Sequence, residues 1–199
     1  EDLKKAERRK VLEDPLAQVA RLDVSYKIPP GNTTDWYALY VLGEILSTGQ
    51  SSRLYQSLVR DKQVAVQVGA GTFERRGPSL FLVDVFVTPG KDPKEVEKPV
   101  IDELERLKTE LVTDAELQKV RMAVKRSKVE QLQGTLYRPQ ALGEYAVFYN
   151  DPNVINTGND KVMNITKEQI RNGVRTYVTA NNRTVLTTIP KPKPAGGAQ

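Results

Sequence analysis

Apolar and polar residues alternate along several short segments of the chain, and a period of two residues is typical of a strand with one buried face. The strands that this alternation predicts are 20–28 and 64–70. Residues 80–87, which are apolar on both faces apart from Asp84, and residues 183–189 are the other two expected strands. In the second of them, Val64, Val66, Val68 and Ala70 are the apolar set. Residues 73–78 combine Gly and Pro with charged residues, which indicates a hairpin connection to the third strand.

Between these strands, apolar residues recur at helical spacing and predict six helices. The expected helices span about 35–47, 51–60, 93–111, 113–133 and 139–148, with a last one from 166. Thr33 or Thr34 can cap the first helix, and Ser51 or Ser52 can cap the second. Capping-box patterns, Thr-x-x-Glu and Thr-x-x-Gln, open the fourth and the sixth.

The element order that results is β, α, α, β, β, α, α, α, α, β. Two adjacent strands joined by a hairpin argue for antiparallel pairing, and the long amphipathic helices need a sheet face to cover. We therefore predict an α+β fold, a two-layer sandwich with a mainly antiparallel sheet covered by helices. One domain is expected over 16–190, preceded by a charged linker at 1–15 that could include a short helix, and followed by a disordered Pro- and Gly-rich tail at 191–199.

Composition excludes several kinds of chemistry. The 199 residues include neither histidine nor cysteine, so Ser-His-Asp and Cys-His catalysis cannot occur within this chain. A zinc site would have to consist of carboxylates alone, which is rare. The formal net charge is +5, but basic and acidic residues interleave over most of the length, so neither a nucleic acid partner nor a membrane span is expected. The chain begins at Glu1 without a signal-peptide pattern, and we interpret it as an excised or processed piece of a longer protein.

Several segments together resemble one protein family. They are LGEIL at 42–46, GQSSRLY at 49–55, LVRDKQ at 58–63, TDAEL at 113–117, the segment 166–182 with its Asn-Asn-Arg turn, and the strand 184–190. Each is weak alone, but their order and spacing over about 15–190 resemble the C-terminal, non-zinc domain of the M16 peptidases, the insulinase, pitrilysin and mitochondrial processing peptidase group.

This resemblance implies a fold of the LuxS/processing-peptidase type and a role in a larger assembly. Family members enclose a chamber with repeated α/β domains, one of which carries a His-x-x-Glu-His zinc motif and hydrolyses peptide bonds with a zinc-bound water. The implied cofactor is therefore zinc in a partner domain, with none in this chain. The implied partners are an N-terminal zinc-bearing domain or homologous subunit, and a peptide substrate. The family also favours a periplasmic or exported location, which a chain without cysteine tolerates.

Arg60 is the candidate site residue. Active M16 proteins use an Arg and, seven residues later, a Tyr on the non-zinc domain to hold substrate, and Arg60 matches the Arg. The Tyr is not matched, because position 67 is Gln and a one-residue gap would place Val66 there. Arg60 is thus a substrate-binding candidate, with a solvated arginine at a helix end as the plainer interpretation.

Other conspicuous residues have plainer interpretations as well. Arg53 could bind an anion or form a helix-surface ion pair. Trp36 and Tyr40 could bind a ligand or pack in the core. The basic stretch Lys119–Lys128 is interpreted as the solvated face of an amphipathic helix. Three glycosylation sequons, at 32–34, 164–166 and 182–184, fit caps or turns.

We predict a non-catalytic domain that helps to enclose and position a peptide against a separate zinc-bearing domain. Without the zinc motif this chain should be inactive by itself. The alternative is a scaffold or partner-binding domain of an inactive M16-like subunit, which the unmatched Tyr favours.

Overall fold

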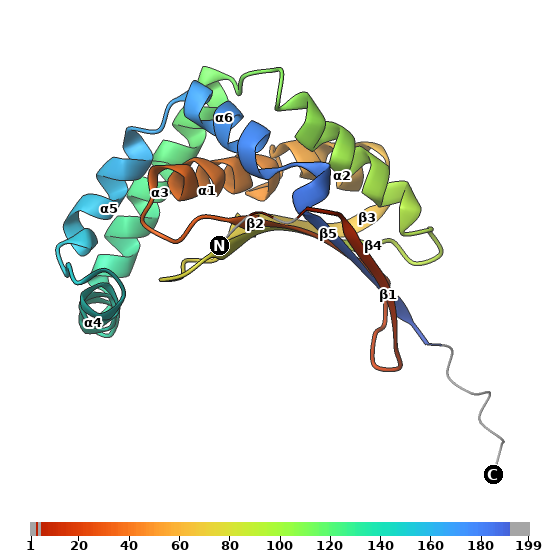
Figure 1. The fold of residues 1–199 in the computed structure, drawn as a ribbon, viewed down its shortest axis with the longest axis horizontal. Helices are drawn as coiled ribbons and strands as arrows, with labels where there is room; N and C mark the ends of the chain where they lie inside the picture. The colour runs from red at the N-terminus through yellow and green to blue at the C-terminus, as the bar shows by residue number, and fades with distance from the viewer. Residues whose placement is uncertain (1–2, 4, 192–199) are drawn as a thin grey trace, which may run out of the picture.

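The computed structural model describes residue 3 and residues 5–191, and their fold is an α+β two-layer sandwich (Figure 1). The strands of its sheet are β1 (Arg8–Asp14), β2 (Arg21–Ile28), β3 (Ala65–Thr72), β4 (Ser79–Val87) and β5 (Arg183–Pro190). They lie in the order β1-β5-β2-β4-β3. Only the β1–β5 pair is parallel, so the predicted fold class with a mainly antiparallel sheet is confirmed.

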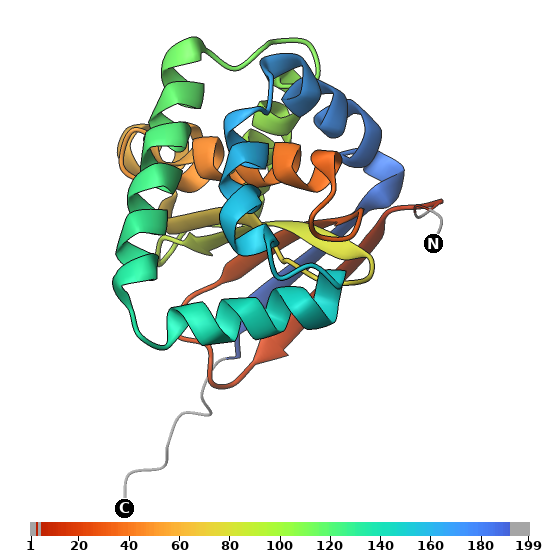
Figure 2. The ribbon, with the colours of Figure 1, turned by 90° about the vertical axis from the view of Figure 1, so that its left-hand side faces the viewer.

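The helices lie on one face of the sheet. They are α1 (Thr34–Ser47), η1 (Tyr55–Asp61), α2 (Lys94–Arg106), α3 (Asp114–Gln133), α4 (Tyr137–Tyr149), α5 (Val154–Met163), α6 (Lys167–Tyr177) and the short η2 (Ala180–Asn182). In both ribbon views no described helix crosses the opposite face (Figures 1 and 2). Nor does any described helix have the length and apolar character needed to span a membrane.

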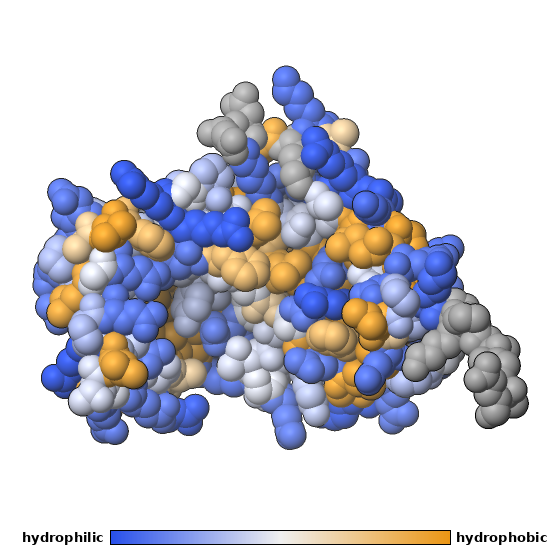
Figure 3. All heavy atoms as spheres, turned by 90° about the horizontal axis from the view of Figure 1, so that it is seen from below, coloured by the Kyte–Doolittle hydropathy of each residue, from blue (hydrophilic) through white to orange (hydrophobic). Residues whose placement is uncertain are grey.

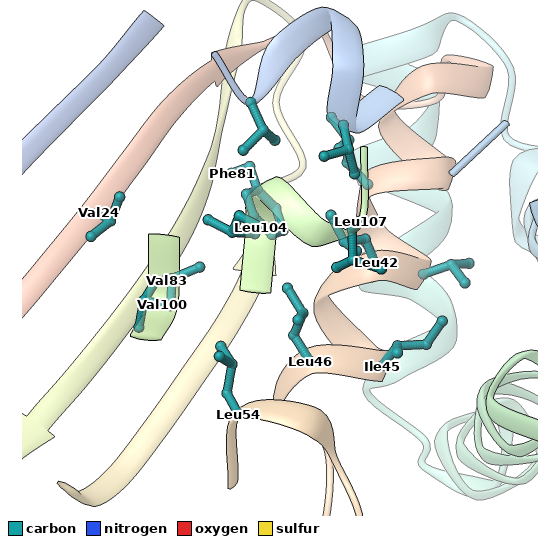
Figure 4. Close-up of a cluster of buried hydrophobic side chains, with 14 of the residues drawn as sticks. Val24, Leu42, Ile45, Leu46, Leu54, Phe81, Val83, Val100, Leu104 and Leu107 are labelled. Atoms are coloured by element: carbon teal, nitrogen blue, oxygen red, sulfur yellow. The ribbon is translucent and has the colours of Figure 1, made fainter. Parts of the chain in front are cut away.

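The core lies between the sheet and the helices. On β2, Leu22, Val24, Tyr26 and Ile28 are at most 2% exposed, while the residues between them point to the uncovered face. Helix α1 is buried on almost all sides, because it lies on β3 and is flanked by α3 and α6. Its Leu42 and Leu46 point toward side chains from β4 and α2 (Figure 4).

Both predicted capping boxes are confirmed. The Thr113 hydroxyl accepts from the backbone N–H of Glu116, while the Glu116 carboxylate accepts from the backbone N–H of Thr113. Thr166 and Gln169 make the same reciprocal pair at the start of α6. Thr33, one of the two predicted caps for α1, accepts from the N–H of Trp36. Local sequence therefore sets these three helix starts.

Two elements are absent from the predicted order. The segment expected to be a linker, with a short helix as an option, contributes the edge strand β1, which pairs along its full length with β5. Its residues are almost all exposed, so no apolar alternation marks it. Helix α5 was missed because Thr, Asn and Gly interrupt its pattern, and only Val154, Ile155 and Val162 are buried. Apart from Lys191, the predicted disordered tail lies outside the described residues.

Two predicted helices differ in detail. The helix expected over 93–111 ends at Arg106, because the N–H groups of Lys108 and Thr109 bond three residues back, and the Arg175 guanidinium donates to the carbonyl of Lys108. Leu107 is still buried, whereas Leu111 is 36% exposed. The helix expected over 51–60 is largely a π-helix, η1, which ends one residue later than predicted.

Candidate functional site

Arg60 lies in the last turn of η1. The N–H of Lys62 bonds five residues back to the carbonyl of Ser57, and buried Leu58 anchors the inner side of the turn. A π-helix is rare and is often found at functional sites. Gln63 then adopts a positive φ of 53°, which turns the chain into β3. Arg60 is therefore presented at an irregular junction between a helix and an edge strand.

The Arg60 side chain is open to solvent. It is 63% exposed, and its Nε lies 2.9 Å from Oδ1 of Asp61, which is itself 57% exposed. An exposed pair of this kind contributes little to stability. The guanidinium thus keeps donors available for another molecule.

Position 67, where the resemblance would place a Tyr, lies beside a β-bulge. Ala65 pairs with Val87 and Gln67 pairs with Phe86, so Val66 is the extra residue. The bulge breaks the alternation that the sequence indicates, because Val66 is 52% exposed whereas Val64 and Val68 are buried. Val66 and Gln67 both face solvent next to η1, and neither offers the hydroxyl of a tyrosine.

Arg53 holds the elements around η1 together. Its Nε and Nη2 donate to the two carboxylate oxygens of Glu116 at 2.6 and 2.9 Å, and its Nη1 donates to Glu103 at 3.0 Å. This bidentate bond is the main reason why the pKa of Glu116 falls to about 2, and it also raises the pKa of Arg53. The ion-pair interpretation of Arg53 is confirmed, although the pair links three elements rather than lying on one helix surface.

The basic stretch on α3 is largely engaged within the chain. Lys119 donates to the Thr48 carbonyl and the Ser51 hydroxyl, and Arg121 donates to the Ile165 carbonyl. Lys128 lies over the ring of Tyr137. Among the sequons, Asn182 is fully buried and donates to two backbone carbonyls.

The structure also assembles a pocket that sequence reasoning missed. It has a volume of about 260 Å³ and lies between α1, the β3–β4 hairpin, α3, α4 and α5. We call it the aromatic pocket, and its defining residues are Trp36, Tyr37, Tyr40, Glu74, Tyr137 and Tyr145. Trp36 and Tyr40 stack here, as the core interpretation expected, but they also form one wall of the pocket. Trp36 and Tyr40, which the sequence also offered as a possible ligand-binding pair, and the tyrosines on α4 were the signals available in the sequence.

No group of three or more His, Cys, Asp or Glu within the described residues could hold a metal ion. With no His or Cys anywhere in the chain, the donor set that catalytic zinc requires is not available here. The residues present therefore do not fit a zinc ion.

Several proteins similar to this chain are described as zinc proteases or as inactive peptidase domains. The family model described as "Peptidase M16 inactive domain" matches residues 1–124. A Helicobacter pylori protein named zinc protease PqqE is 30% identical over 112 residues, which cover 56% of this chain and 25% of that protein. The chain therefore aligns with about a quarter of the length of this relative.

Solved structures extend the likeness over nearly the whole chain. A protease from Helicobacter pylori gives a TM-score of 0.87 at 22% identity and covers 95% of this chain and 45% of that one. An inactive peptidase domain from Bordetella parapertussis gives 0.81 at 23% and covers 94% and 99%. The periplasmic protease PqqL from Escherichia coli gives 0.69 at 15% and covers 94% and 21%. At these identities the structures show a shared fold.

Proposed function

This chain belongs to the peptidase M16 family as one of its inactive domains, and from that premise we propose that it is the non-catalytic C-terminal domain of a zinc-dependent peptidase. In this role it encloses a peptide and positions it against a separate domain or subunit that carries the zinc. The observation that carries the proposal is a complete M16-type fold in a chain without a single zinc-binding His or Cys.

The uncovered face of the sheet supports a role in packing against another domain. On this face, Leu82 and Leu186 lie beside polar neighbours, and the guanidinium of Arg21 lies 5.2 Å from the centre of the Phe86 ring. Figure 3, which views the molecule from this side, shows apolar patches interspersed with polar ones. Interfaces between domains have this mixed character.

A charged group at the centre of that face fits the same role. Asp23 lies opposite Asp84 across the β2–β4 pair, and Arg21 approaches Asp23 to 2.7 Å. Burial, followed by the charge of Asp84, raises the pKa of Asp23, while Arg21 opposes this shift. A partner surface that supplies a further cation or donor here would relieve two neighbouring carboxylates.

The first test is zinc content and peptide cleavage, measured side by side on this chain and on the longer protein that contains it. We expect zinc and chelator-sensitive cleavage in the longer protein and neither in this chain, because the chain lacks the ligands. Chelator-resistant cleavage by the purified chain would contradict the proposal. Absence of both activities from both samples would favour the scaffold role instead.

Within this proposal Arg60 binds substrate. Changing Arg60→Gln in the longer protein should lower kcat/KM for a peptide by about tenfold, since a hydrogen bond to a charged group is worth about 1.5 kcal/mol or more. The thermal midpoint should not change, because the side chain is 63% exposed and pairs only with an exposed neighbour. Arg126→Gln, at another exposed arginine, is the matched control. Equal cleavage by Arg60→Gln and the control would remove Arg60 from the site without affecting the enclosing role.

The second candidate function is a scaffold or partner-binding domain of an inactive M16-like subunit. The bulged segment with Val66 and Gln67 in place of a Tyr favours it. Purification of the longer protein under native conditions distinguishes the two. A stable complex with a separate zinc-containing subunit supports the scaffold role, whereas peptide cleavage by the longer protein alone excludes it.

A periplasmic or exported location is part of the proposal. It is supported by the likeness to a periplasmic protease of Escherichia coli. Fractionation of cells that produce the longer protein, followed by detection of this domain, tests it directly.

A further inference from the structure

The aromatic pocket combines two walls of aromatic rings with one carboxylate. From α1, the rings of Trp36 and Tyr40 stack with centroids 5.7 Å apart, and Tyr37 meets Trp36 edge-on at 5.1 Å. From α4, Tyr145 stacks on Tyr149 at 6.1 Å. Glu74, from the β3–β4 hairpin, lies among these rings as one of the lining residues.

Glu74 is half-buried and incompletely neutralised. Its Oε1 accepts one hydrogen bond, of 2.8 Å, from the Tyr149 hydroxyl. Within the described part of the chain no Lys or Arg forms an ion pair with it. Burial is the main reason why its pKa is raised, with nearby Glu144 adding to the rise while Tyr149 and Lys161 oppose it. A desolvated carboxylate of this kind favours an incoming cation.

The contact between Glu74 and Tyr149 lies against the backbone of Gly31. At Gly31, a Cβ atom would lie 2.8 Å from Cγ of Glu74 and would also meet the Tyr149 hydroxyl. The Gly31 N–H donates to the carbonyl of Arg75 at 2.8 Å, which ties this position to the hairpin. A side chain at position 31 would therefore force the Tyr149 hydroxyl and the Glu74 side chain to move.

The chain already places cations against rings of the same cluster. Lys161 Nζ lies 5.8 Å from the centre of the Tyr37 ring and bonds to Asn32, and Lys128 Nζ lies 5.7 Å from the centre of the Tyr137 ring. Burial lowers the pKa of Lys128. Lys128 also lines the pocket, where it would compete with an incoming cation for the ring faces.

We propose that the aromatic pocket binds the side chain of a lysine or arginine presented by a peptide. The ring faces attract the cation, as in aromatic cages that recognise alkylated ammonium groups. The Glu74 carboxylate forms an ion pair with it. A volume of about 260 Å³ suits one long side chain rather than a folded partner. Seen from below, the surface is hollowed between the helices at the left and the sheet (Figure 3).

Cation binding by this chain does not depend on the proposed function, although its meaning as a substrate anchor does. Trp36 is the only tryptophan in the chain, so its fluorescence reports on the pocket directly. The 199-residue chain is titrated with the blocked tripeptide Gly-Arg-Gly, with the same tripeptide carrying neutral citrulline, and with tetramethylammonium. We expect the arginine peptide to bind about tenfold more tightly than its citrulline counterpart, which corresponds to about 1.4 kcal/mol.

Variants then test which groups carry the binding. Glu74→Gln should lower the affinity for the arginine peptide by about tenfold or more, because a hydrogen bond between two charged groups is lost. Glu168→Gln, at an exposed acid on α6 outside the pocket, is the matched control and should change affinity less than twofold. Lys128→Met should tighten binding by removing the competing cation. Tyr145→Leu, which removes a ring but keeps apolar volume, should also weaken binding. Thermal melts followed by circular dichroism check that each variant is folded.

Three results would overturn the inference: equal binding of the arginine and citrulline peptides, unchanged affinity in Glu74→Gln, or tetramethylammonium binding more tightly than the peptide. The last result would assign the pocket to a free ammonium compound. The outcome is separable from the proposed function. If the longer protein does not cleave peptides, this chain can still bind the arginine peptide. If this chain does not bind the arginine peptide, the longer protein can still cleave peptides.

Discussion

Replacing Gly43 by alanine should lower the free energy of unfolding by about 1–3 kcal/mol, because a methyl group is forced into a closely packed contact. Helix α1 crosses β3 at this point, and a Cβ on Gly43 would lie 2.8 Å from Cα of Gly71 and 2.9 Å from the carbonyl oxygen of Ala70. Both are backbone atoms, so neither can rotate away. The same approach allows Ser47 to exchange hydrogen bonds with the backbone of Ala70.

The sign of this effect is what makes it informative. In an open helix position, alanine stabilises relative to glycine by about 0.5–1 kcal/mol. Gly143 in α4 offers that case, since a Cβ there would have no neighbour within 4 Å. Urea unfolding of both variants should therefore show Gly43→Ala less stable and Gly143→Ala more stable than the wild type. A Gly43→Ala variant as stable as the wild type would mean that α1 and β3 do not approach this closely.

Replacing Arg53 by methionine should cost about 2–3 kcal/mol, between the values for an exposed and a fully buried ion pair. The Arg53 side chain is 13% exposed, and its partners Glu103 and Glu116 are 15% and 26% exposed. The substitution leaves two partly buried carboxylates without their shared cation and frees η1 from α2 and α3. Arg126→Met is the control, because Arg126 is 77% exposed and lies 3.7 Å from Glu130. Its effect on urea unfolding should stay under about 0.5 kcal/mol.

The same ion pair predicts how stability depends on pH. In the folded protein the Arg53 guanidinium is the main reason why the pKa of Glu116 falls from its ordinary value of 4.5 to about 2. Between these values the unfolded chain binds the proton first, so this contribution is complete above about pH 4.5 and is lost as the pH falls toward 2. In Arg53→Met this acid-dependent loss should shrink. Urea midpoints measured from pH 7 to pH 2 check it, and parallel curves for the two proteins would contradict the assignment.

Some elements could be predicted from local sequence because local chemistry is sufficient for them. The alternation on β2 and the capping residues Thr33, Thr113 and Thr166 each act within a few residues, and the structure places all of them as expected. Strand β1 could not be predicted in this way. It is exposed and charged, and it is a strand only because β5, more than 170 positions away in the sequence, offers its edge.

The candidate site divides in the same manner. Arg60 could be singled out by resemblance, and the helix end that carries it was expected, whereas the π-helix and the bulge that exposes Val66 depend on how η1 and β3 meet. No pattern in the sequence marks Glu74, because a glutamate in a hairpin is ordinarily solvated. It becomes a candidate binding group only when Gly31 lets the hairpin approach Tyr149.

The sequence by itself determined what this chain cannot do and which fold it adopts: with no His or Cys it cannot form a catalytic zinc site, and its helix caps and alternating strands specify an α+β sandwich. Only the tertiary structure decided which polar groups are buried next to one another. Desolvation of Glu74 among tyrosines, and of Arg53 between two carboxylates, arises from elements that are distant in the chain. Charge chemistry depends on burial, and burial is a property of the packed fold rather than of any local segment.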